Sequence, residues 1–155
     1  MTITKDANGF QLERRGAEVI LHRIPSTAGK DVTVPPSVTK ILKSAISGNK
    51  LTTLPILANV KEISAGLLSA LPNIEKITVS KNNPYFESDG TALFTKGRTC
   101  LLSVPTSLSG IYFVPSGVKH IDKEAFRDCK NLKSVVLPQS VLTIEKYAFE
   151  NCTKL

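Results

Sequence analysis

The chain has 155 residues, of which 41% are hydrophobic and 6% aromatic, and this fits a single globular domain. Its formal net charge of +7 is spread over both halves, without a basic arm and without basic residues alternating with aromatic ones. This distribution lacks the usual signature of a nucleic-acid-binding protein, so we expect no nucleic-acid partner.

The longest uncharged segment is not a membrane span. It runs from Thr99 to Val118, but ten of its 20 residues are Ser, Thr, Gly or Pro. A membrane helix needs nearly continuous apolar residues, because lipid offers no partners for its backbone. The N-terminal sequence MTITKDANGF also lacks the apolar core of a signal peptide. We therefore expect no membrane insertion and no signal peptide in this sequence.

In chain order, the first element is a β-rich insert that begins at Gly9 and aligns with a second insert that begins at Gly90. The aligned positions pair Gly9, Leu12, Gly16, Pro25 and Pro35 with Gly90, Leu93, Gly97, Pro105 and Pro115, with one gap between Gly16 and Pro25. The alignment predicts a single domain over residues 1–155 that is built from a duplicated unit, residues 9–80 and 90–155. Each copy has an insert followed by two coils.

Two coils of apolar residues follow the first insert. Their apolar positions are Val38, Ile41, Ala45, Ile46 and Leu51, and then Ile63, Leu67, Leu68, Leu71 and Ile74. Fixed apolar spacing over a short period is typical of a solenoid, in which each coil buries its apolar side only by stacking on its neighbours.

The second insert contains three predicted strands. They are Ala92–Thr95, Cys100–Val104 and Ile111–Val114. The first two are joined by Lys96-Gly97-Arg98, a short link with Gly that suits a hairpin.

The last two coils carry the clearest repeat. Val118, Ile121, Ala125, Phe126, Cys129 and Leu132 recur at one constant interval as Val141, Ile144, Ala148, Phe149, Cys152 and Leu155. The second copy stops at Leu155, so its last strand is missing, and we expect the chain to be part of a longer array. The repeat predicts that Phe126 and Phe149 are buried at equivalent positions.

Each coil is predicted to contain one strand and one short helix. Leu132-x-x-Val135-x-Leu137 directs alternate residues inward, as a half-buried strand requires. Residues Asp122 to Asp128 predict one or two helical turns, with Ala125 and Phe126 on the inner side.

The pattern SV-x-x-I-x-x-x-AF-x-x-C-x-x-L-x-x-V-x-L-P resembles the BspA-like leucine-rich repeat. Residues 115–155 match it closely, and residues 34–79 match it loosely. The inserts resemble those of large BspA-like proteins, notably in NPYFESDGTALF. The resemblance implies an α/β fold: a right-handed leucine-rich-repeat solenoid, β-rich, with short helices and β-hairpin inserts. It also implies a surface or secreted protein that binds other proteins.

The cysteines and histidines form no recognisable catalytic motif. Cys129 and Cys152 share a repeat position, so we expect them to fill the core; a metal pair or a disulfide is the alternative. Cys100 is expected to be half-buried on its strand. His22 and His120 lack partners at motif spacing. We predict no catalytic residues, no cofactor and no metal, and therefore no enzyme.

The candidate partner-binding residues flank the middle apolar position of each predicted repeat strand, on the concave side. They are Thr53, Lys76, Thr78, Ser134 and Val136. Pro55 occupies a similar position, but Pro cannot donate to a sheet ladder, which puts the register of the first coil in doubt.

Three functional hypotheses follow. The first is a non-enzymatic recognition or adhesion domain of a larger surface or secreted protein, with a protein or extracellular-matrix ligand and contacts to neighbouring repeats of the same chain. The second is an intracellular scaffold or adaptor built on the same solenoid, which the free cysteines favour. The third is an enzyme that uses His120 with Cys129.

Overall fold

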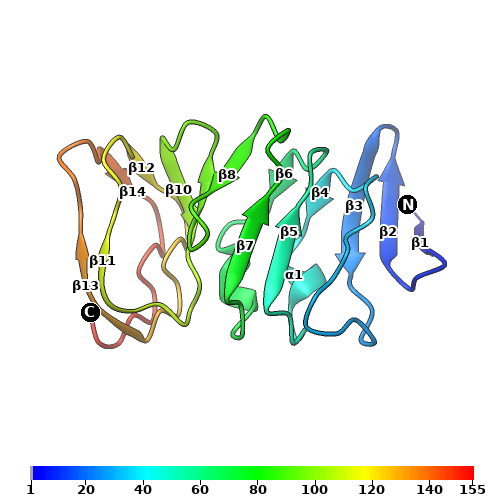
Figure 1. The fold of residues 1–155 in the computed structure, drawn as a ribbon, viewed down its shortest axis with the longest axis horizontal. Helices are drawn as coiled ribbons and strands as arrows, with labels where there is room; N and C mark the ends of the chain where they lie inside the picture. Colours follow the sequence, from blue (N-terminus) through cyan, green and yellow to red (C-terminus); the bar gives the residue numbers. More distant parts are fainter. Residues whose placement is uncertain (1) are drawn as a thin grey trace.

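The computed structural model describes residues 2–155, which form a solenoid with two layers of strands (Figure 1). The first layer contains β1 (Ile3–Lys5), β2 (Gln11–Arg15), β3 (Glu18–Arg23), β4 (Lys40–Ile41), β6 (Glu62–Ile63), β8 (Phe86–Ser88), β9 (Leu93–Thr95), β10 (Cys100–Ser103), β12 (His120–Ile121) and β14 (Thr143–Ile144). The second layer, in front in Figure 1, contains β5 (Thr53–Ile56), β7 (Lys76–Val79), β11 (Ser109–Phe113) and β13 (Asn131–Val136).

The first layer consists of two five-stranded sheets with the same pattern of connections. Their strand orders are β1-β2-β3-β4-β6 and β8-β9-β10-β12-β14. In each sheet the first three strands are antiparallel and the last two join in parallel. The predicted hairpin at Gly97 is confirmed between β9 and β10, and the φ of +78° at Gly97 is one that glycine adopts without strain.

The second layer consists of two parallel ladders, each of which links equivalent positions of successive coils. In the first ladder β5 pairs with β7, from Thr53 opposite Lys76 to Ile56 opposite Val79. Pro55 lies inside β5, opposite Thr78. Because β5 pairs with only one strand, it is an edge strand, where proline is tolerated. The first coil therefore keeps its register despite the proline.

In the second ladder β11 pairs with β13. The predicted insert strand Ile111–Val114 lies largely within β11, although the strand ends at Phe113. However, the strand runs parallel to β13, with one register shift between Gly110 and Ile111. The end of the insert therefore serves as the repeat strand of a coil.

The described residues contain two short helices, both in the first half. They are α1 (Lys43–Ile46) and the 3-10 helix η1 (Leu67–Ala70). No helix of residues 2–155 has the length and apolar character needed to cross a bilayer.

The predicted helix over residues 122–128 is wrong, because residues 123–128 form consecutive turns. Glu124 and Asp128 have φ values of +60° and +61°, which interrupt a right-handed helix. The backbone N–H of Phe126 donates to the carbonyl of Ala148, at 2.8 Å, in the next coil. Bonds between coils thus replace bonds within a helix.

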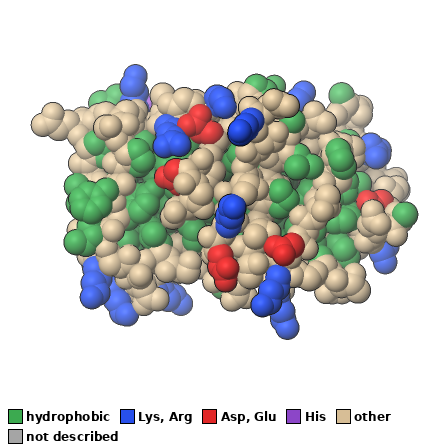
Figure 2. Space-filling model, viewed as in Figure 1, with side chains coloured by type: hydrophobic (Ala, Val, Ile, Leu, Met, Phe, Trp, Pro, Cys, Tyr) green, Lys and Arg blue, Asp and Glu red, His purple; other side chains and the backbone are tan. Residues whose placement is uncertain are grey.

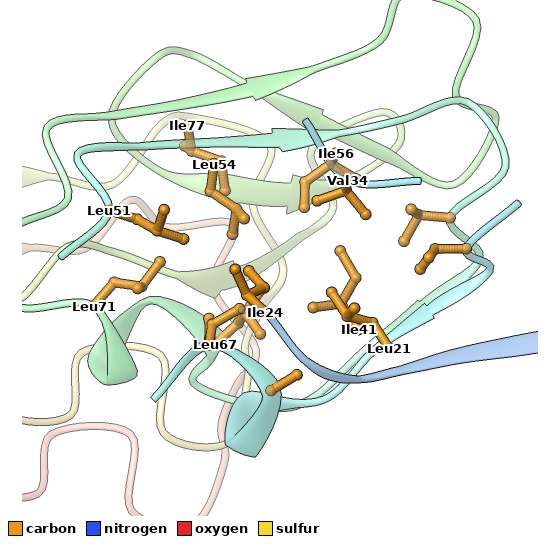
Figure 3. Close-up of a cluster of buried hydrophobic side chains, with 14 of the residues drawn as sticks. Leu21, Ile24, Val34, Ile41, Leu51, Leu54, Ile56, Leu67, Leu71 and Ile77 are labelled. Carbon is orange, nitrogen blue, oxygen red and sulfur yellow. The ribbon is translucent and has the colours of Figure 1, made fainter. Parts of the chain in front are cut away.

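The core lies between the two layers in two clusters. The first cluster includes Leu54 and Ile77 from the second layer and Leu21 and Ile41 from the first (Figure 3). The second cluster surrounds Phe126, which is 0% exposed. Phe149 is only half-buried, contrary to prediction, because it lies in the last coil and is covered mainly on the side of Phe126.

The two halves meet tightly at Gly66, next to η1. The Lys43 ammonium lies 2.8 Å from a Glu124 carboxylate oxygen across this junction. A Cβ on Gly66 would lie 2.7 Å from the Glu124 Cβ, closer than real side chains approach. The backbone N–H of Leu68 donates to the Ser103 hydroxyl at 3.1 Å. Side-chain contacts across the junction therefore join the second half of the molecule to the first.

Candidate interaction surface

The predicted binding residues of the first ladder lie on its outward side. Thr53 faces Lys76 across β5 and β7, and Thr78 lies two residues further along β7. Lys76 and Thr78 are exposed. Thr53 is half-buried, and its hydroxyl donates to the Asp31 carboxylate at 2.6 Å. The alternate residues of β5 are buried, as the two-residue repeat of a strand requires.

The predicted residues of the second ladder lie beside two exposed apolar side chains of β11. Ser134 faces Ile111, and Val136 faces Phe113. Ile111 is 59% exposed, Phe113 67% and Val136 43%. We call Ile111, Phe113 and Val136 the β11–β13 patch. The predicted residues are therefore distributed over two ladders, and the most apolar part of this surface belongs to the second.

Ile111 and Phe113 are not among the predicted binding residues, because β11 was expected to belong to an insert. The signal was nevertheless present in the repeat interval. Ile111 precedes Ser134 by the same interval that separates Phe126 from Phe149, and Phe113 precedes Val136 by this interval too. Because Ser134 and Val136 were predicted to point outward, the same interval predicts that Ile111 and Phe113 point outward too.

Aromatic packing supports the β11–β13 patch from below. Tyr112 lies between the two outward residues of β11 and points inward. Its ring makes an edge contact with Phe126, with 5.7 Å between the ring centroids. Phe126 in turn stacks on Phe149 at 4.9 Å. Aromatic pairs of this kind add to the energy of packing, so the strand that carries the outward residues is packed against the second core.

Lysines border the patch at the start of β13. Lys130 and Lys133 are exposed, and Lys154 donates to the side-chain oxygen of Asn131 at 2.9 Å. In residues 2–155 none of the three forms an ion pair. Figure 2 shows hydrophobic side chains gathered at the left over β11 and β13, with Lys and Arg side chains along the lower border. An apolar centre with a basic edge suits a partner that carries apolar and acidic groups.

The three thiols are free and mostly protected. Cys129 is buried in the second core, as predicted; its thiol donates to the Pro105 carbonyl, and burial raises its pKa to about 12. Cys152 is half-buried against the same cluster, and burial raises its pKa too. Cys100 is half-buried on β10, as expected, with a pKa raised by burial to about 11. Raised pKa values keep these thiols protonated near neutral pH.

The histidines do not form the proposed cysteine–histidine pair. His120 is exposed on β12, where its Nδ1 lies 2.9 Å from the Thr143 hydroxyl. Cys129 is fully buried, so the hypothesis that pairs it with His120 has no geometric support. His22 contacts Glu13, with 2.7 Å between Nε2 and a carboxylate oxygen. Within residues 2–155, no group of three or more His, Cys, Asp or Glu is arranged to hold a metal ion.

Comparison with known families gives one match. The sequence model of the BspA type leucine-rich repeat region matches residues 26–95 and 104–155 in six copies, two more than the four coils found in the sequence. The matched ranges include β11, which was expected to belong to the second insert, and β8, which lies in the insert-like segment NPYFESDGTALF. No protein with curated function matches the chain.

Three solved structures are similar to this chain. A leucine-rich repeat protein from Eubacterium ventriosum is 29% identical, with a TM-score of 0.69 over 77% of this chain and 32% of its own. The pneumococcal vaccine antigen PcpA is 27% identical, with a TM-score of 0.64 over 76% and 30% of the two chains. A leucine-rich cell surface protein from Faecalibacterium prausnitzii is 29% identical, with a TM-score of 0.59 over 72% and 30%. The chain thus spans about a third of the length of these proteins.

Proposed function

Because the chain belongs to the BspA-type leucine-rich repeat family, we propose that it is a protein-recognition domain that binds its partner through the second layer of strands. The binding surface would include Thr53, Lys76, Thr78, Ser134 and Val136, together with the outward residues of β11. Repeat domains of this family are generally non-enzymatic and mediate protein interactions.

The observation that carries the proposal is the β11–β13 patch. It exposes three apolar side chains, one of them aromatic, on a parallel ladder. Contiguous exposed apolar side chains are costly in water unless a partner covers them, and aromatic residues are frequent among those that dominate binding energy. The lysines at the border would attract carboxylates of the partner.

The wider context of the proposal is a larger surface or secreted protein with a role in adhesion to a protein or extracellular-matrix ligand. The similarity to a cell surface protein and to a pneumococcal antigen supports this location. We further infer that residues 9–80 and 90–155 are two copies of one unit. The two sheets of the first layer support this inference, because they have the same strand order. The right-handed sense of the coil stays a prediction.

The test compares the wild-type chain with Phe113→Ser in binding to a phage-displayed library of random peptides. Wild type should enrich peptides in which an aromatic or aliphatic residue is flanked by Asp or Glu. Phe113→Ser should weaken the Kd of the enriched peptides at least about tenfold, the size expected for a residue at the centre of an interface.

The matched control is Tyr85→Ser, which removes an aromatic side chain that is 43% exposed outside the patch. Both variants should have a thermal stability close to that of the wild type. A loss of binding in Phe113→Ser then reflects a lost contact with the peptide and not unfolding. Failure of the wild type to enrich any peptide, or equal Kd values for all three proteins, would contradict the proposed surface.

A second candidate, an intracellular scaffold or adaptor, is favoured by the three free cysteines, because intracellular proteins usually keep their thiols reduced. Antibody labelling of intact and permeabilised source cells separates the two. Labelling of intact cells supports the surface protein, and labelling only after permeabilisation supports the scaffold.

A further inference from the structure

A cavity of about 600 Å³ lies at the N-terminal end of the solenoid, away from the β11–β13 patch. It is bordered by Gln11 of β2, by the end of β3, by Ser26 and residues 28–30, and by residues 47–50, which follow α1. Its volume lies within the range of small-molecule binding sites.

The cavity exists because two positions of the first copy carry small or polar residues where the second copy carries core residues. Pro25 aligns with Pro105, so Ala28 takes the place of Leu108, and Asn49 takes the place of Cys129. Leu108 packs against the second core, and Cys129 belongs to it. Ala28 also packs against the first core, but its side chain is shorter than that of Leu108, and both Ala28 and Asn49 line the cavity.

The lining of this cavity is basic. Arg23, Lys30 and Lys50 all border it, and no Asp or Glu does. None of these three cations forms an ion pair within residues 2–155. The nearest acid in sequence, Asp31, is outside the lining and accepts a hydrogen bond from Thr53. A concave site with charges of one sign concentrates counter-ions, so the cavity should attract anions.

Neutral hydrogen-bonding groups complete the lining. Ser26 and Ser44 contribute hydroxyl groups that make no side-chain hydrogen bond among those of the described residues, and Gln11 contributes an amide. Ser47 already donates to the Lys43 carbonyl at 3.1 Å, which leaves its oxygen as an acceptor. Such groups can form hydrogen bonds with the hydroxyls of a ligand, so they suit a hydroxylated ligand better than an apolar one.

We propose that this cavity binds a small organic phosphate that carries hydroxyl groups, of the sugar phosphate class. Arg23, Lys30 and Lys50 bind the phosphate through charge-assisted hydrogen bonds, and the serine hydroxyls and the Gln11 amide bind the hydroxyl groups. The inference is independent of the proposed protein-binding surface, because no residue of the cavity lies on β5, β7, β11 or β13.

The test is isothermal titration calorimetry of the chain with glucose 6-phosphate, glucose and inorganic phosphate as probes. Glucose 6-phosphate should bind saturably with one site per chain, inorganic phosphate more weakly, and glucose without measurable heat. The double variant Arg23→Gln/Lys50→Gln should weaken binding of glucose 6-phosphate at least about tenfold, as expected when charge-assisted hydrogen bonds are lost.

Two further variants distinguish the effect of the cavity's shape on binding from the effect of the net charge. Ala28→Leu places in the cavity the residue that the second copy has there, and it should abolish binding without changing the net charge. Lys119→Gln removes an exposed cation outside the cavity lining, and it should leave the affinity unchanged. If Ala28→Leu does not fold, the comparison of Arg23→Gln/Lys50→Gln with the separate control Lys119→Gln still tests the proposal. These substitutions should not disturb folding, because Arg23, Lys50 and Lys119 are exposed.

Three outcomes would overturn the proposal. The first is the absence of saturable heat with glucose 6-phosphate. The second is an equal loss of affinity in Lys119→Gln and the double variant, which would indicate a general effect of net charge. The third is binding of inorganic phosphate as tight as that of glucose 6-phosphate, which would mean an adventitious ion only.

Discussion

At the scale of single residues, Phe126 has the most central place in the second half of the molecule. Its ring contacts Tyr112 from the second layer and stacks on Phe149 of the next coil. The side chain therefore joins two coils and supports the β11–β13 patch from below. Phe113, by contrast, points outward and is 67% exposed.

We expect Phe126→Ala to lower the free energy of unfolding by about 3–5 kcal/mol, because it removes a buried ring and leaves a cavity. Phe113→Ala serves as the matched control and should change this free energy by no more than about 0.5 kcal/mol. Urea denaturation followed by circular dichroism measures both. Equal midpoints for Phe126→Ala and wild type would remove Phe126 from the core.

The thiols offer a second prediction at this scale. Burial raises the pKa of Cys129 to about 12 and that of Cys100 to about 11, so the reactive thiolate is scarce near pH 8. We expect slow alkylation of both residues in the native protein, slowest at Cys129, and fast alkylation in denaturant. Peptide mass spectrometry after timed exposure to iodoacetamide measures each rate. Fast native labelling of Cys129 would show that its coil opens.

At the scale of elements, the turns of the last two coils replace the helices of the first two. Residues with a positive φ recur at equivalent positions of the last two coils. Glu124 corresponds to Tyr147, and Asp128 corresponds to Asn151. Asx-type residues tolerate this conformation, but Glu and Tyr rarely adopt it. The backbone N–H of Glu124 donates to the carbonyl of Lys146, at 3.4 Å, in the next coil. Stacking of coils therefore maintains a conformation that local sequence preference does not favour.

The segment before η1 approaches the Glu124 turn closely at Gly66. Gly66 has a φ of +57°, and an added Cβ would lie 2.7 Å from the Glu124 Cβ and 3.0 Å from its carbonyl oxygen. Gly66→Ala should therefore lower the free energy of unfolding by about 2 kcal/mol or more, from backbone strain and from the clash.

Gly16→Ala is the matched control for this prediction. Gly16 has a similar φ of +60°, but nothing lies within 4 Å of its added Cβ. The control should lose only about 1 kcal/mol, from the left-handed backbone alone. Thermal or urea unfolding of both variants gives the difference. Equal losses would mean that η1 and the Glu124 turn do not approach as closely as described.

At the scale of the whole molecule, the two halves meet through apolar as well as polar contacts. Phe86 and Leu93 of the second sheet belong to the first core, and Leu102 packs against it. The Lys43–Glu124 ion pair spans 81 residues of sequence. Glu124 also contacts Arg127, 3.5 Å away. The hydrogen bond from Lys43 is the largest of the effects that hold the pKa of Glu124 below its usual value.

A depressed carboxyl pKa predicts a loss of stability in acid. The contribution of Glu124 is present above its pKa in the unfolded chain and is lost as pH falls through its lower pKa in the folded state. Between about pH 6 and about pH 3, wild type should therefore lose more stability than Glu124→Gln does. Glu75→Gln, at an exposed carboxylate, is the control and should follow wild type. Urea midpoints at several pH values measure the effect, and parallel curves for wild type and Glu124→Gln would contradict it.

The sequence by itself determined the repeat interval, the inward residues of the first three coils and the hairpin at Gly97, whereas Ile144 and Leu155 of the last coil are exposed. These follow from local rules, because apolar spacing and turn chemistry are written in neighbouring residues. Only the tertiary structure decided that β11 lies beside β13, that residues 123–128 form turns, and that a basic cavity lies beside Arg23. Each of these depends on groups of another coil, distant in sequence, which complete a ladder, accept a backbone hydrogen bond or leave a space unfilled.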